Sequence, residues 1–165
     1  MVTAPEPRAR PDPHAGEADM LSGWLDWQRA TVRLKCTDPH EDKAYIRFIP
    51  TSPRLTIATV VSHLTSVEHG WFTRSFLGDD EPPPTAGWDE THTPLPVLLD
   101  AYDAQCERSR NVIAGHSLDD IERTAPPGLP HVSLRWIVGH MIEETARHLG
   151  HLDLLRELAD GRTSY

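Results

Sequence analysis

Histidine is frequent in this chain, with 10 among 165 residues. Two of these histidines and one glutamate, from two distant segments, have side chains that can bind a metal ion. Glu144 and His148 stand four residues apart in one predicted helix, and His63 stands in another. At about 100° per residue, Glu144 and His148 fall within the apolar arc of their helix, and His63 falls at the edge of its own. Because burying a lone charge is costly, such a carboxylate must be paired, protonated or bound to a metal.

Two imidazoles and one carboxylate form a donor set that suits Zn²⁺, Ni²⁺, Fe²⁺ and Mn²⁺. Two helices of one bundle can present such ligands to one point. We predict a divalent metal, with Zn²⁺ preferred, held by His63, Glu144 and His148. Three protein ligands leave positions open for water or substrate, which is typical of catalytic sites. A metal-free interpretation also fits, in which Glu144 and His148 form a buried hydrogen-bonded pair and His63 is a satisfied core histidine.

Four helical patterns would position these side chains. Apolar residues recur at helical spacing over residues 19–36, 56–77, 94–115 and 133–161. Thr56 is a suitable N-cap for the second helix, and Gly78 is expected to stop it. Long loops rich in proline and glycine separate the helices, and alternation with a period of two is weak. We therefore predict an all-α fold, a four-helix bundle with long inter-helix loops.

The composition fits one globular domain. With 38% hydrophobic and 25% charged residues, a chain of this length can bury a core without disulfides. We predict a flexible tail at residues 1–18, which carry four prolines, and a single domain at residues 19–165. The net charge of −9 disfavours binding to nucleic acid or to anionic membranes. Without a hydrophobic signal segment or a long apolar span, we expect a cytoplasmic location.

Two segments are similar to motifs of a known superfamily. The sequences HLTSVEHGWF (63–72) and EETARHLGHLD (143–153) resemble the DinB-like superfamily, which contains mycothiol-dependent maleylpyruvate isomerase and the bacillithiol transferases. The resemblance covers about residues 20–160 and is greatest to an actinobacterial branch. It implies a DinB-like four-helix bundle with a first metal ligand at His63. It also implies a ligand pair four residues apart on the last helix, here Glu144 and His148.

His151 stands where many members of this superfamily carry glutamine. Three roles are open to it: a fourth metal ligand, a partner of a ligand, or a proton donor, and we take it as the candidate catalytic residue. Among the tryptophans, Trp88 lies in a long loop and is the one most suited to contact a ligand. Trp24, Trp71 and Trp136 lie on predicted helices and are expected in the core.

The resemblance implies thiol chemistry. A metal lowers the pKa of a bound thiol and makes thiolate available at neutral pH. We expect a metal-dependent S-transferase or isomerase that uses a low-molecular-weight thiol, such as mycothiol, on an electrophile, and metal-assisted hydrolysis is chemically close. Two further classes stay open, because fold does not fix function. One is a metal-binding or stress-associated protein without turnover, and the other is a metal-free helical interaction domain.

A homodimer is expected, since two-fold assembly is common among folds of this shape. The face of the second predicted helix that carries Phe72 and Phe76 is the candidate interface, which requires both rings to be exposed. His69, on the same helix, is predicted to face solvent.

Overall fold

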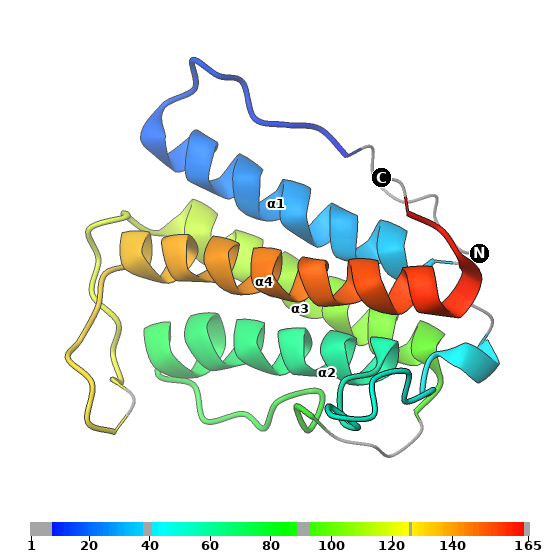
Figure 1. Cartoon of the computed structure of the whole chain (residues 1–165). Helices are drawn as coiled ribbons and strands as arrows, with labels where there is room; N and C mark the ends of the chain where they lie inside the picture. The colour runs from blue at the N-terminus through cyan, green and yellow to red at the C-terminus, as the bar shows by residue number, and fades with distance from the viewer. Residues whose placement is uncertain (1–7, 38–40, 89–92, 126, 164–165) are drawn as a thin grey trace.

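Helices dominate the computed structural model of the chain, which describes residues 8–37, 41–88, 93–125 and 127–163 (Figure 1). The long helices are α1 (Glu17–Cys36), α2 (Ile57–Glu68), α3 (Leu95–Gly115) and α4 (Leu134–Asp160). A π-helical segment, η2 (His69–Phe76), continues α2 directly. A short 3-10 turn, η1 (Glu41–Lys43), lies between α1 and α2 along the chain. The described residues contain no β-strand, so the predicted all-α class is confirmed.

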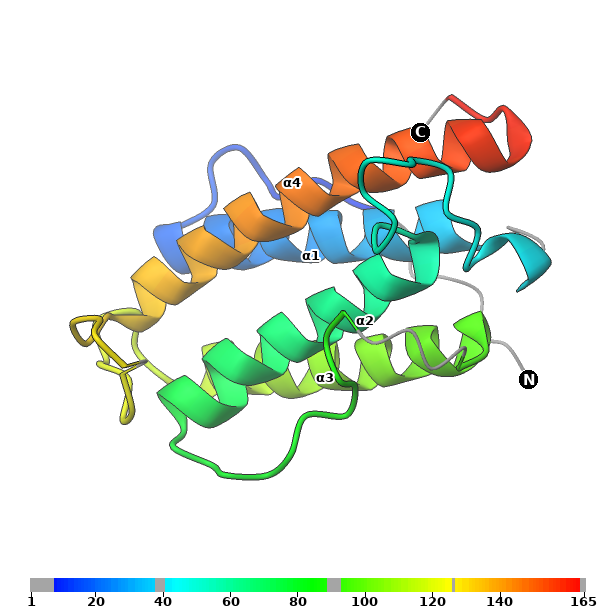
Figure 2. The ribbon, with the colours of Figure 1, turned by 60° about the horizontal axis from the view of Figure 1, so that its bottom comes forward.

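The helices form two layers, with α1 beside α4 in one and α2 beside α3 in the other (Figure 2). Each helix turns an apolar stripe inward, so the core lies between the layers. There Val60 and Leu64 of α2 join Leu152 and Leu155 of α4 in one buried cluster with Tyr102 of α3. This packing is the predicted four-helix bundle, and it sets α2 opposite α4.

Local sequence signals explain where the helices begin and end. The Thr56 hydroxyl accepts a hydrogen bond from the backbone N–H of Thr59 at 3.2 Å, which caps α2. Ser133 caps α4 in the same way, accepting from the N–H of Trp136 at 3.3 Å. Gly161 ends α4 with a φ of 76°, a left-handed conformation that glycine adopts without strain. The predicted helix bounds differ from the observed ones by only one or two residues at most ends.

The π-helical segment η2 buries the face that we expected to be exposed. Phe72 is fully buried and Phe76 is 3% exposed, and both pack in the second core cluster with Leu25 and Ile137. A π-helix closes its hydrogen bonds one residue later than an α-helix, so it turns through a smaller angle per residue. That difference rotates both rings from the predicted outer face into the core. The proposed interface is therefore wrong, because both rings are buried. The homodimer itself stays a prediction.

The prediction that His69 faces solvent is also wrong. His69 is 2% exposed, and its Nε2 has no hydrogen-bond partner within the described part of the chain. Burial lowers the pKa of His69, and the nearby Arg108 guanidinium lowers it further. The folded protein therefore holds His69 neutral at pH values where an unfolded chain would protonate it.

This burial predicts an acid-sensitive contribution to stability. As pH falls below about 6.5, the unfolded chain takes up a proton at residue 69 that the folded chain resists, so the free energy of unfolding falls. In His69→Leu, we expect a smaller loss of stability between about pH 7 and about pH 5 in urea titrations. His14→Leu, which replaces an exposed histidine, is the control. An unchanged pH dependence in His69→Leu would refute this assignment.

The remaining expectations concern the tail and the tryptophans. Residues 1–7 of the predicted flexible tail lie outside the described residues, and residues 8–16 run along α1, with the Arg8 guanidinium 4.3 Å from the centre of the Trp27 ring.

Trp24 is 36% and Trp136 is 46% exposed, so the prediction that both lie in the core is wrong. None of the helices in the described ranges combines the length and apolarity needed to cross a membrane.

Candidate metal centre

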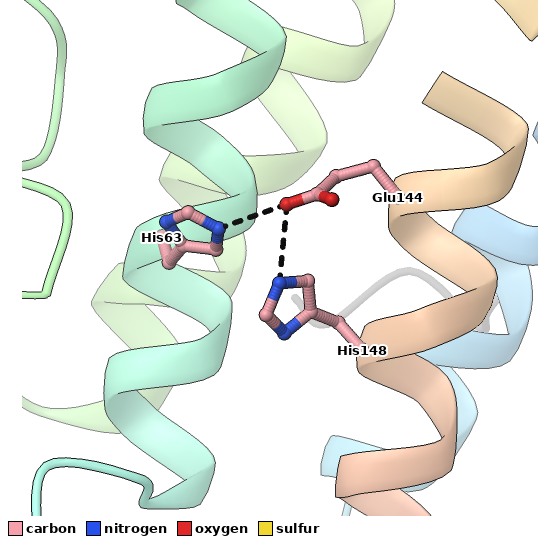
Figure 3. A group of neighbouring side chains, drawn as sticks. All are labelled: His63, Glu144 and His148. Atoms are coloured by element: carbon pink, nitrogen blue, oxygen red, sulfur yellow. Dashed lines mark hydrogen bonds and ion pairs between the residues drawn. The ribbon is translucent and has the colours of Figure 1, made fainter. Parts of the chain in front are cut away.

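Three predicted ligands meet between the two layers of the bundle (Figure 3). His63 projects from α2 toward α4, where Glu144 and His148 project back from successive turns. One ligand atom from each lies within 4.8 Å of the other two. Glu144 Oε1 is 3.1 Å from Nε2 of His63 and 3.2 Å from Nε2 of His148. Both ring nitrogens therefore converge on a single carboxylate oxygen.

Helix geometry accounts for this convergence. Residues four apart in an α-helix share a face, so Glu144 and His148 point the same way from α4. Because α2 lies opposite α4, His63 at the edge of its apolar stripe reaches the same point. Glu144 is 7% and His148 4% exposed, and the His63 side chain is 17% exposed. His63 is thus the most exposed of the three side chains.

The charges of the cluster are those that a metal requires. Burial raises the pKa of Glu144. The hydrogen bond from His63 and the nearby His148 and Arg147 together lower it by more, so the pKa of Glu144 is below the ordinary value. Burial and His63 lower the pKa of His148, against the opposing effect of Glu144. At neutral pH the carboxylate is therefore ionised and His148 is neutral. Metal ligation needs these two protonation states.

The donor atoms also fit a small divalent ion. Two ligands bound at about 2.0–2.1 Å to a tetrahedral Zn²⁺ lie roughly 3.3 Å from each other. The two nitrogen–oxygen distances, 3.1 and 3.2 Å, are close to that separation. A mixed nitrogen and oxygen set suits Zn²⁺, Ni²⁺, Fe²⁺ or Mn²⁺. His63, Glu144 and His148 are the residues that would hold the ion.

Arg147 contacts the carboxylates of both Glu143 and Glu144. Its exposed guanidinium donates to Glu143 at 2.7 Å and lies 3.0 Å from Oε2 of Glu144, the oxygen that the histidines do not contact. This contact leaves Oε1 to face His63 and His148. Our sequence reasoning did not assign this role to Arg147, although a spacing of three residues on one helix indicates such a contact.

Trp88 covers the His63 side of the cluster. Its ring stacks on the His63 imidazole with centroids 4.3 Å apart and an angle of 19° between the planes. The ring lies 5.6 Å from that of His148. The loop that carries Trp88 is tied to α2 by a hydrogen bond of 2.7 Å from the Thr85 hydroxyl to the Ser62 carbonyl. Trp88 is thus the aromatic side chain that lies over the cluster, and its contact with a ligand stays a prediction.

His151 lies beside the cluster and does not join it. Its Nδ1 is 3.2 Å from Nδ1 of His148, the ring nitrogen that points away from Glu144. His140, one turn before Glu144, stacks on Trp136 at 5.1 Å instead. Asp153, to which the sequence assigned no role, forms an ion pair of 2.5 Å with Lys35. Glu144 and His148 are thus the two side chains of α4 that meet His63 in the cluster.

The comparisons with known proteins point to one family. A family model described as mycothiol S-transferase matches residues 20–161, which include all three residues of the cluster and His151. The comparisons with curated proteins and with solved structures found no match.

Proposed function

Since the chain belongs to the mycothiol S-transferase family, we propose that it is a metal-dependent transferase that joins the thiol of mycothiol to an electrophile. The observation that carries the proposal is the convergence of His63, Glu144 and His148 from two helices. These side chains would hold the divalent ion, and Zn²⁺ is the ion we propose first.

The chemistry follows from this donor set. When bound, a divalent ion lowers the pKa of a thiol, so that thiolate is available at neutral pH. The thiol proton passes to solvent, the sulfur forms a bond to the electrophilic carbon, and the leaving group departs with its bonding electrons. Arg147 contacts the oxygen of Glu144 that the histidines do not. Trp88 shields His63 from water.

The position of His151 favours an open site over a filled one. A protein that only stores metal would complete the coordination with its own side chains, and His151 was the candidate fourth ligand. Because His151 contacts the far nitrogen of His148, three protein donors remain. A tetrahedral ion with three protein ligands keeps one position for the cosubstrate thiol.

The test compares metal content and thiol transfer in the same samples. Protein purified without chelator is analysed for metal by mass spectrometry and assayed with mycothiol and monochlorobimane, with glutathione as the alternative thiol. We expect about one equivalent of Zn²⁺ per chain and transfer that prefers mycothiol. His148→Ala should lose the metal and lower the rate by about 100-fold or more. His140→Ala, one turn away on α4, is the matched control and should keep both.

Each other outcome selects a different function. Wild-type protein that holds the metal but transfers no thiol would be a metal-binding protein without this turnover. Wild-type protein that takes up neither Zn²⁺ nor Ni²⁺ would refute the metal-dependent proposal and favour a helical interaction domain.

A further inference from the structure

The ring of His63 is held in place differently from the other two side chains of the cluster. Glu144 and His148 lie one turn apart on the inward face of α4, whereas the His63 side chain is 17% exposed at the edge of α2. Among the described residues, the hydrogen-bonding contact of the His63 ring is the one of 3.1 Å with Glu144. A histidine that binds a metal usually has a second hydrogen bond, at its other nitrogen, which fixes the orientation of the ring. For His63 another kind of contact must supply that restraint.

Stacking against Trp88 supplies it. The two rings lie 4.3 Å apart between centroids and only 19° from parallel. The His148 ring meets the same imidazole edge-on, with centroids 4.7 Å apart. An imidazole that lies flat against an indole loses that contact when it rotates about its Cβ–Cγ bond, and such aromatic pairs are favourable. The stack therefore restrains His63 in the orientation in which Nε2 faces Glu144.

Two residues of the loop before Trp88 set the path that brings the indole there. The Thr85 hydroxyl donates to the carbonyl of Ser62, the residue before His63, at 2.7 Å. Gly87, the residue before Trp88, has a φ of 68°. A Cβ at Gly87 would come no closer than 3.7 Å to Ser66, which is an ordinary contact. The backbone conformation, and not lack of space, is thus what requires glycine at this position.

We propose that Gly87 and Thr85 are positioning residues, which direct the loop so that Trp88 stacks on His63 and holds its imidazole toward the metal. The inference rests on the proposed metal site. Thr85 fixes where the loop meets α2, and the positive φ of Gly87 sets the direction in which the chain continues to Trp88. Their effect on the metal passes through the indole ring.

The first test measures the stack without metal. Full-length, chelator-treated protein is studied by ¹H–¹³C correlation spectra of the histidine rings at one fixed pH, and His63→Gln identifies the signals of His63. The ring current of the indole should shift these signals upfield in wild type, and Trp88→Leu should abolish the shift. Gly87→Val should reduce it, because a β-branched residue is strongly disfavoured at a positive φ. Gly87→Asn should keep it, because asparagine is among the residues that tolerate this conformation.

The second test measures the affinity for Zn²⁺ by competition with a chelator. Trp88→Leu and Gly87→Val should bind about 3–10-fold more weakly, which is the range expected for the loss of one aromatic contact. Gly87→Asn should bind as wild type does. Thr85→Val should also weaken binding, whereas Thr85→Ser keeps the hydroxyl and should not. Trp24→Leu removes an exposed indole on α1 and should change neither measurement.

The outcomes separate this inference from the proposed function. If Gly87→Val keeps the upfield shift, or loses it and still binds Zn²⁺ as tightly as wild type, the positioning role is wrong and the metal site stands. Equal affinities in Thr85→Val and Thr85→Ser would remove Thr85 from the device. If wild-type protein binds no Zn²⁺, the proposed function fails, and the effect on the metal fails with it. The spectra of the metal-free protein then still decide whether Gly87 places Trp88 on His63.

Discussion

Glu68→Ala should lower the free energy of unfolding by about 3–5 kcal/mol, because it leaves a buried guanidinium with only the partly exposed Asp26, 3.0 Å from its Nη1, as a counter-charge. Glu68 of α2 is fully buried, and Arg29 of α1 is 3% exposed. Nε and Nη2 of Arg29 each donate to one carboxylate oxygen of Glu68 at 2.7 Å. Burial alone would lower the pKa of Arg29, but Glu68 raises it well above the ordinary value. A guanidinium stays protonated at neutral pH even without a partner, so the charge remains in the core when Glu68 is removed.

Urea-induced unfolding checks this prediction, with two further variants as controls. Glu81→Ala breaks an exposed ion pair of 3.0 Å with Arg108 and should change stability by less than about 1 kcal/mol. The double variant Arg29→Met/Glu68→Leu replaces both charges with apolar side chains and should recover most of the loss. A loss below about 1 kcal/mol in Glu68→Ala would show that water reaches Arg29 when Glu68 is absent.

The same ion pair bears on the metal site through the position of α2. It joins α1 of one layer to α2 of the other, five residues after His63 along the chain. A bidentate contact restrains both the rotation and the translation of a helix, because two parallel hydrogen bonds must be satisfied together. We therefore expect the pair to hold α2 in the register that places His63 opposite Glu144.

The sequence alone was sufficient for features that depend on regular α-helical geometry. On α4 the fixed rotation per residue brings Glu144 and His148 onto one inward face, and the observed helix has them there. Capping is equally local, so Thr56 identified the start of α2. The three-residue cluster needed one more assumption, that α2 and α4 face each other, and the bundle supplies it.

Other features depend on contacts that are remote in sequence or on irregular backbone. Phe72 was misplaced because the change from α- to π-helical winding at residue 69 leaves no mark in the apolar pattern. His69 was misplaced because it continues the polar face of α2 that carries Ser62 and Thr65, and that face is buried too. Nothing in the sequence indicates that Arg29 and Glu68, 39 residues apart, form a buried ion pair. The stacking of Trp88 on His63 depends on a loop path that hydrophobic periodicity does not encode.

Saturating Zn²⁺ is expected to raise the free energy of unfolding by about 4 kcal/mol when its free concentration is about 1,000 times the dissociation constant. For a chain of this size, that gain corresponds to a rise in Tm of roughly 8–16 °C. The physical reason is the placement of the ligands. His63 and the pair on α4 belong to different layers, so the unfolded chain cannot present them together. The measurement is thermal unfolding of chelator-treated protein with and without Zn²⁺.

His148→Ala decides what the shift means. If the ion binds the cluster, the variant should gain almost no stability from Zn²⁺, while His140→Ala should gain as much as wild type. The metal-free interpretation makes the opposite prediction: Zn²⁺ leaves the wild-type Tm unchanged, and His148→Ala loses the contacts with Glu144 and His151. A shift that survives in His148→Ala would place the ion elsewhere and remove the basis for thiol activation at this cluster. Stability therefore tests the metal site without any assumption about the electrophile.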